Sequence, residues 1–102
     1  MPAYREPEII QWGIDRNILG PTGEGKRSKQ LDKTKEEVKE LRDALIDRDL
    51  NAIRDAIGDI YVTLVMQAHL NGITMSSCID AAWDQIKSRR GRMVNGVFVK
   101  ES

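Results

Sequence analysis

Residues 33–68, KTKEEVKELRDALIDRDLNAIRDAIGDIYVTLVMQA, decide the fold, because their pattern predicts two amphipathic helices joined by a short turn. Apolar side chains recur at three- and four-residue intervals on both sides of Asp49, which is the spacing of one helical face. Asp49 is a favourable N-cap for the second helix, since its carboxylate can accept from the first free backbone amides. Nine of the sixteen acidic residues lie between Asp32 and Asp59, so both helices are rich in carboxylates.

Four of these carboxylates predict a metal site between the two helices. Glu37 and Glu40 are three residues apart and share one face of the first helix. Asp55 and Asp59 are four residues apart and share one face of the second. Asp59 has apolar neighbours in its helix, where a carboxylate is costly unless a cation meets it. Grouped carboxylate oxygens are the ligands that Mg²⁺ or Mn²⁺ prefers, so the spacing predicts a site for one of these ions.

A different interpretation of the acidic residues makes them a solvated helix face. Carboxylates on such a face pair with lysines one turn away, as Lys33 can with Glu37. The protein would then be a non-catalytic helical interaction or regulatory module, such as a small dimeric adaptor that its acidic face keeps soluble. Metal titration separates the two interpretations, because only a metal-binding protein gains stability in Mg²⁺ and loses it in chelator.

The remaining segments predict two further helices and a hairpin. Pro7 can start a short first helix, Ser28 can cap the long second helix, and either Thr74 or Ser76 can cap a fourth. Asn95-Gly96 between two short apolar runs is the strongest local signal for a two-residue hairpin turn. We therefore expect helices over residues 8–19, 28–47, 49–70 and about 74–90, followed by a hairpin over residues 92–100.

Three expectations concern packing. Gly58 lies inside the third helix, and we interpret it as a point where a neighbouring helix comes close to Asp59. Trp83 is expected in the core. The expected buried face of the second helix consists of Leu31, Thr34, Val38, Leu41 and Leu45.

Length and composition indicate one small soluble domain. The chain has 102 residues, of which 40% are hydrophobic and 31% charged. Long amphipathic helices in so short a chain leave apolar faces uncovered, so we expect a homodimer or homotetramer. The sixteen basic and sixteen acidic residues cancel, which argues against a nucleic-acid polymer or an anionic membrane as a partner.

Two single residues narrow the function classes further. Cys78 is the only cysteine, so an internal disulfide is excluded. Together with the lack of a signal-peptide pattern and of a run of about 18 apolar residues, it favours a cytoplasmic location. His69 is the only histidine, which excludes a zinc site of the usual spacing.

Several segments together resemble the MazG-like all-α nucleoside triphosphate pyrophosphohydrolases. They are LDKTKEEVKEL at residues 31–41, DAIGDI at 55–60, IKSR at 86–89 and GRMVNGVFVK at 91–100. The resemblance implies a single domain over residues 1–102 with an all-α, four-helix core and a short C-terminal hairpin. It also implies Mg²⁺-dependent hydrolysis between the α and β phosphates of a nucleoside triphosphate, giving monophosphate and pyrophosphate, and assembly as dimers or tetramers.

The chain departs from the family pattern at two positions. The second acidic motif of the family usually has a glutamate three residues before its aspartate, where this chain has Ala56. Asp55 lies one position away and can take over that role directly or through water. Asp84 stands where relatives often have asparagine, and its carboxylate would repel phosphate unless it is turned toward Lys87 or Arg90.

The resemblance also implies roles for individual residues. Either Glu36 or Glu37 is the general base toward the attacking water. Trp12 can stack on the base of the nucleotide, although its helical spacing with Ile9 also suits a core residue. The expected metal ligands are Glu37, Glu40, Asp55 and Asp59, and the expected phosphate-binding residues are Lys33, Lys87 and Arg89.

Overall fold

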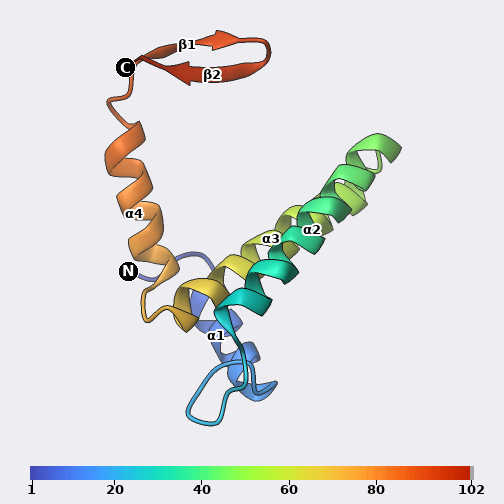
Figure 1. Cartoon of the computed structure of the whole chain (residues 1–102), viewed down its shortest axis with the longest axis vertical. Coiled ribbons are helices and arrows are strands. Elements are labelled where there is room, and N and C mark those ends of the chain that lie inside the picture. The colour runs from blue at the N-terminus through green and yellow to red at the C-terminus, as the bar shows by residue number, and fades with distance from the viewer. Residues whose placement is uncertain (102) are drawn as a thin grey trace.

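The computed structural model describes residues 1–101, which form four helices and one two-stranded antiparallel sheet (Figure 1). The all-α class with a C-terminal hairpin is thus confirmed. None of these helices is both long and apolar enough to cross a lipid bilayer. The elements are α1 (Glu6–Asp15), α2 (Arg27–Asp47), α3 (Leu50–Leu70), α4 (Met75–Ile86), β1 (Gly91–Val94) and β2 (Val97–Lys100).

The long helices α2 and α3 form an antiparallel pair that makes the most extensive contact in the fold. Arg48 takes the left-handed conformation and ends α2, and Asp49 caps α3 by accepting from the backbone amides of Asn51 and Ala52 at 3.0 and 3.2 Å. The capping role predicted for Asp49 is therefore confirmed. Small buried residues, Ala44 on α2 and Ala56 on α3, allow the two helices to approach closely.

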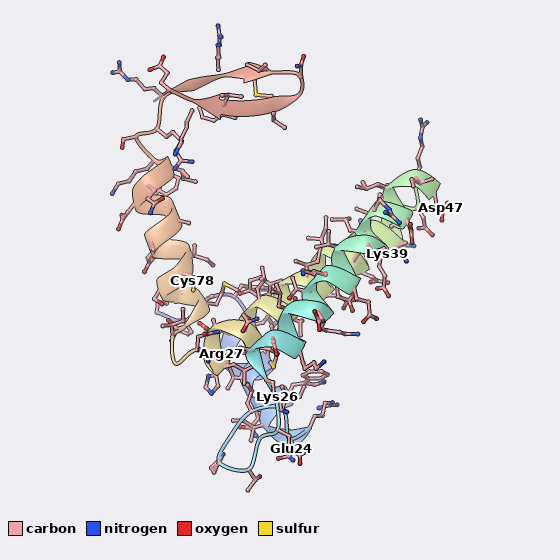
Figure 2. All side chains as sticks on the ribbon, viewed as in Figure 1. Glu24, Lys26, Arg27, Lys39, Asp47 and Cys78 are labelled. Carbon is pink, nitrogen blue, oxygen red and sulfur yellow. The ribbon has the colours of Figure 1, made fainter. Side chains whose placement is uncertain are left out.

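Helix α2 begins one residue earlier than predicted and without the expected cap. Its N-cap is Lys26, which makes no side-chain capping hydrogen bond, so the prediction that Ser28 caps this helix is wrong. Figure 2 shows Arg27 at the start of α2 beside the loop after α1, and Asp47 at the opposite end of the helix. The start of α2 is instead attached to α3 by a hydrogen bond, in which the Gln67 side chain donates to the Arg27 carbonyl at 3.0 Å.

Helix α1 crosses the pair near the start of α2 and ends at Asp15, four residues before the predicted end. The Gly13 carbonyl accepts from the amides of both Ile18 and Leu19, which turns the chain back and buries Leu19. A Cβ at Gly13 would lie only 2.6 Å from Met66 Sδ, so a larger residue there would require the buried Met66 side chain to shift.

Helix α4 leaves the pair at an angle and carries the hairpin away from it (Figure 1). Thr74 caps α4 by accepting from the Ser77 amide at 3.0 Å, and Ser76 does not serve as the cap. The helix ends at Ile86 and not near Arg90 as predicted, because the chain turns there and enters β1.

The predicted hairpin is confirmed, with strands that pair from Gly91 with Lys100 to Val94 with Val97. Both turn residues have positive φ, 50° at Asn95 and 84° at Gly96. This is the combination that a type I′ turn requires and that Asn-Gly favours.

Three packing expectations are wrong in the described chain. A Cβ at Gly58 would meet nothing within 4 Å, so no helix approaches it. Trp83 is 57% exposed, because α4 contacts α3 only near its own start. On α2, the face expected in the core is covered only where α3 lies against it. Leu31, Val38 and Leu45 are each about half exposed, and only Thr34 and Leu41 are partly buried.

Candidate metal and nucleotide site

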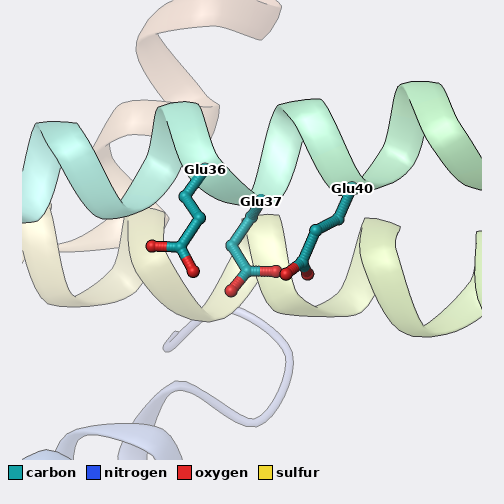
Figure 3. Close-up of side chains that lie close together, drawn as sticks. All are labelled: Glu36, Glu37 and Glu40. Carbon is teal, nitrogen blue, oxygen red and sulfur yellow. The ribbon is translucent and has the colours of Figure 1, made fainter.

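Three glutamates of α2 form a compact carboxylate cluster (Figure 3). Glu36, Glu37 and Glu40 each place one oxygen within 4.8 Å of the others. The helix itself dictates this arrangement, since positions i, i+1 and i+4 lie along neighbouring sides of one turn. In Figure 3 the three side chains extend from α2 in the direction of α3.

Glu37 is the buried member of the cluster, with only 6% of its surface exposed. Lys33 lies one turn earlier, with its Nζ 3.4 Å from Glu37 Oε1 and 3.3 Å from Glu36 Oε1. Glu37 Oε2 is buried and has no hydrogen-bond donor within residues 1–101. A buried carboxylate oxygen without a donor is costly, and a hard cation removes that cost. The donor set and its incomplete neutralisation therefore fit a divalent metal such as Mg²⁺.

The pKa values of two carboxyls show how crowded this region is. The pKa of Glu40 lies above its usual value. The first cause is a hydrogen bond with the adjacent Glu37 carboxylate, which favours the protonated form of Glu40, and the second is the negative charge of Glu37, which disfavours another negative charge beside it. The pKa of Asp59 is raised first by burial and then by the negative charges of Glu37 and Asp55. Lys33 opposes both shifts but does not cancel them.

The two acidic motifs approach each other at the cleft, where Glu37 of α2 and Asp59 of α3 both contribute to the lining. Asp59 on α3 is close enough to Glu37 on α2 for its pKa to respond to that charge, and both side chains line one cleft. Asp55 acts on Asp59 from one turn earlier on α3. Arg54, beside Asp55 in the sequence, donates to Asn51 Oδ1 at 2.9 Å. Within residues 1–101, the carboxylate oxygens that lie close enough together to share one ion are those of Glu36, Glu37 and Glu40. The structure brings Asp59 to the same cleft as Glu37, but neither Asp55 nor Asp59 belongs to this cluster.

A cleft with a volume of about 520 Å³ lies between α1, α2 and α3, beside this cluster. Its volume is within the range typical of small-ligand sites. One part of the lining is charged or polar, and the other part is apolar. The lining residues are Arg5, Glu8, Ile9, Trp12, Ile18, Gln30, Lys33, Glu37, Asp59, Val62, Thr63 and Met66.

Trp12 belongs to the cleft and not to the core. It is 41% exposed, and the Arg16 guanidinium lies 4.4 Å from the centroid of its ring. The Trp12 ring therefore lines the cleft, with the Arg16 guanidinium over one of its faces.

Two predicted phosphate-binding residues lie elsewhere. Lys87 and Arg89 follow the end of α4 and do not line the cleft of their own chain. Lys87 Nζ pairs with Asp84 Oδ1 at 3.0 Å, so the Asp84 carboxylate is turned toward one of the two cations that could offset its charge. Lys33 is the predicted phosphate-binding residue that the structure does bring to the cleft.

The sequence interpretation missed Arg5 and Gln30 as cleft residues. Arg5, Glu8, Ile9 and Trp12 are spaced by three and four residues, so they lie along one face at and after the start of α1. That spacing was visible in the sequence. Gln30 lies one turn before Lys33 on α2, and its side chain donates to the Thr63 carbonyl at 3.3 Å.

An all-helical core in which a Glu-Glu-x-x-Glu face meets an aspartate of the next helix is that of an all-α nucleotide pyrophosphohydrolase. The family model described as phosphoribosyl-ATP pyrophosphohydrolase matches residues 18–86, which is more than half of the chain. The chain therefore belongs to this family, which is of the MazG-like all-α type, and the family supports pyrophosphohydrolase activity on a nucleotide. No curated protein and no solved structure matches the chain. The matched range includes α2, α3 and α4 and leaves out α1.

Proposed function

We propose that this protein is a cytoplasmic Mg²⁺-dependent enzyme that hydrolyses a nucleoside triphosphate to the monophosphate and pyrophosphate. The observation that carries the proposal is the buried, partnerless Oε2 of Glu37, set in a carboxylate cluster at the edge of a cleft with an apolar wall. A triphosphate is strongly anionic, so this acidic edge can receive it only after a cation has neutralised the carboxylates.

Glu37, Glu40, Asp59 and Asp55 would hold the Mg²⁺, with Mn²⁺ as the other suitable ion. When bound, the metal would polarise the α-phosphate and make a bound water more acidic. The burial of Glu37 and its partnerless oxygen suit a ligand, whereas Glu36 is exposed and suits the general base. Glu36 would accept a proton from a water molecule while the oxygen of that water attacks the α-phosphorus. The bond between the α-phosphorus and the α–β bridging oxygen would break, and pyrophosphate would leave with the bridging oxygen.

The cleft offers matching surfaces to the rest of the nucleotide. The base would lie against the apolar wall with Trp12 as a stacking surface, and Lys33 would contact phosphate at the boundary with the acidic cluster. Because Lys33 pairs with Glu37 as well as Glu36, metal binding to Glu37 would weaken one of these two contacts and make the ammonium more available to the substrate.

The identity of the substrate is tested by a panel scored for pyrophosphate release in Mg²⁺. The panel contains standard and modified ribo- and deoxynucleoside triphosphates together with phosphoribosyl-ATP, the compound named in the description of the family. Release from one or more simple triphosphates is expected. Release from phosphoribosyl-ATP alone would replace the proposed substrate, and release from none would favour the non-catalytic helical module.

We expect Asp55 to contribute to metal binding in place of the glutamate that is missing at Ala56. Asp55→Ala should weaken Mg²⁺ affinity and lower activity together, each by about 10-fold, because the site loses one charge and one oxygen donor. The metal dependence of turnover measures both effects, and Asp43→Ala on an exposed part of α2 is the control. An unchanged Mg²⁺ requirement would reduce the site to three protein carboxylates and leave Asp55 a surface residue, worth less than about 0.5 kcal/mol of stability.

We also propose that the chain assembles as a homodimer or homotetramer through its exposed apolar side chains. Ile79, Trp83 and Ile86 recur at three- and four-residue intervals on α4, and each is about half exposed. Because α4 directs Lys87 and Arg89 away from the cleft of their own chain, we propose that they contact the phosphates bound by a neighbouring copy.

Trp83→Glu should convert the oligomer to monomer, since it places a charge in an apolar contact. Size-exclusion chromatography with light scattering gives the mass. Gln85→Glu introduces the same charge on the same helix, outside the apolar stripe, and should leave the mass unchanged. A Trp83→Glu variant with the wild-type mass, or a monomeric wild type, would contradict this interface.

A further inference from the structure

Arg5 is a cation on the wall of the cleft that α1 contributes, whereas the carboxylates come from α2 and α3. The cleft lining within residues 1–101 contains two cationic side chains, Arg5 and Lys33. Lys33 is held within 3.4 Å of the acidic cluster by its contacts with two of its carboxylates. Arg5 has no such tie to the cluster, since its ion pair is with Glu8 on α1.

The backbone around Arg5 is fixed on both sides. The Tyr61 hydroxyl of α3 donates to the Tyr4 carbonyl at 2.7 Å. The buried Glu6 carboxylate accepts from the Ala3 amide at 3.0 Å and from the Met75 amide at 2.6 Å. The segment that carries Arg5 is thereby attached to α3 and to the start of α4.

Arg5 itself has φ 59°, a left-handed conformation that is uncommon for a residue other than glycine. A residue other than glycine retains this backbone conformation only where surrounding contacts fix the backbone. Arg5 is the N-cap of α1 and makes no capping hydrogen bond with its side chain. The helix start therefore does not need the guanidinium, which leaves it available to the cleft.

The Arg5 guanidinium contacts the Glu8 carboxylate and the Tyr4 ring, whose centroid lies 5.4 Å from Arg5 Cζ. Arg5 Nη1 lies 3.2 Å from Glu8 Oε2, and both side chains are exposed. An exposed ion pair of this kind contributes little stability, whereas a planar guanidinium binds phosphate oxygens through two parallel hydrogen bonds. A phosphate that enters the cleft can thus take the place of Glu8.

We propose that Arg5 binds the β and γ phosphates of the substrate, the part that leaves as pyrophosphate, and that Glu8 holds the guanidinium in place while the cleft is empty. This inference rests on the proposed function, because it concerns the same cleft. The carboxylate cluster accounts for the α-phosphate end of the substrate, and Arg5 supplies the positive charge that the leaving group needs on another wall. Arg5 and α1 lie outside residues 18–86, the range that the family model matches.

The test uses Arg5→Gly, because glycine accepts positive φ without strain and the start of α1 is preserved. Arg48→Gly is the matched control, since Arg48 also has positive φ, 54°, and lies at the end of α2 that is farther from α1. Calorimetry in Mg²⁺ measures the binding of a non-hydrolysable α,β-methylene triphosphate and of the corresponding monophosphate. Pyrophosphate release with the hydrolysable triphosphate gives kcat and KM for the same variants.

Arg5→Gly should weaken triphosphate binding by about 10- to 100-fold and change monophosphate binding by less than about 3-fold, because only the triphosphate has the phosphates that Arg5 contacts. Arg5→Lys should fall between Arg5→Gly and wild type, and Arg48→Gly should match wild type. Equal weakening of both ligands, or no weakening, would overturn the role of Arg5 while the proposed function stands. A wild type with no affinity for the triphosphate would overturn both.

Discussion

Glu40→Gln and Asp59→Asn are each expected to lower pyrophosphate release by at least about 100-fold while leaving the helix content unchanged. Each substitution removes one negative charge and keeps nearly the same volume. The pKa of Glu40 is raised by the adjacent Glu37, and that of Asp59 first by desolvation and then by Glu37 and Asp55, so a bound cation would relieve repulsion at both carboxyls. Initial rates in Mg²⁺ and circular dichroism of the same samples provide the measurement.

Asp43→Asn is the control for these two variants. Asp43 lies one turn beyond Glu40 on α2, pairs with Arg42 at 3.5 Å and is exposed. Its neutralisation should change turnover by less than about 2-fold, since exposed ion pairs contribute little. Near-normal turnover in Glu40→Gln or in Asp59→Asn would remove that residue from the metal site and with it the proposed assignment.

Mg²⁺ is expected to raise the melting temperature of the wild type by more than about 10 °C at a concentration about 100 times the dissociation constant. Binding to the folded state alone adds about 2.7 kcal/mol to the free energy of unfolding at that concentration, and about 1 kcal/mol shifts a domain of this size by about 4–8 °C. Glu37→Gln should lose most of this shift, because Glu37 supplies the buried oxygen that has no other partner. A melting temperature indifferent to both Mg²⁺ and chelator would favour the non-catalytic helical module.

The same measurement in chelator has a defined pH dependence. The raised pKa values of Glu40 and Asp59 mean that the folded state holds these protons more tightly than the unfolded state does. The stability contributed by these groups therefore falls as the pH rises from their unfolded pKa through the raised folded value. At pH 7 in chelator, Asp59→Asn should melt up to about 4 °C above wild type, and the difference should vanish at pH values below the unfolded pKa. A lower melting temperature for Asp59→Asn would make Asp59 a structural ion-pair residue.

The elements with strong local signals were predictable from the sequence. The α2–α3 pair follows from apolar spacing and from the N-cap Asp49, and the hairpin follows from Asn95-Gly96. The end of α1 was not predictable in this way, because it depends on the two amides that return to the Gly13 carbonyl. Helical spacing shows which face is apolar but not what covers it, and for this reason Trp83 was wrongly placed in the core.

In the candidate site, too, the residues of one helix were predictable from the sequence, whereas contacts between different elements were not. The cluster of Glu36, Glu37 and Glu40 lies on a single helix, so its spacing alone predicts it. The approach of Asp59 to that cluster depends on how α3 is aligned against α2, which the order of the two motifs suggested but did not fix. Arg5 reaches the cleft through a left-handed backbone conformation and a hydrogen bond from Tyr61, and neither has a sequence signal.

The central claim is that the carboxylate cluster beside the cleft supports cleavage between the α and β phosphates. Phosphorus NMR of a reaction in Mg²⁺, with a triphosphate selected from the panel, identifies the products directly. We expect nucleoside monophosphate and pyrophosphate in equal amounts with wild type, a rate at least about 100-fold lower with Glu40→Gln, and no turnover in excess chelator. Formation of diphosphate and orthophosphate, or equal rates with and without chelator, would contradict it.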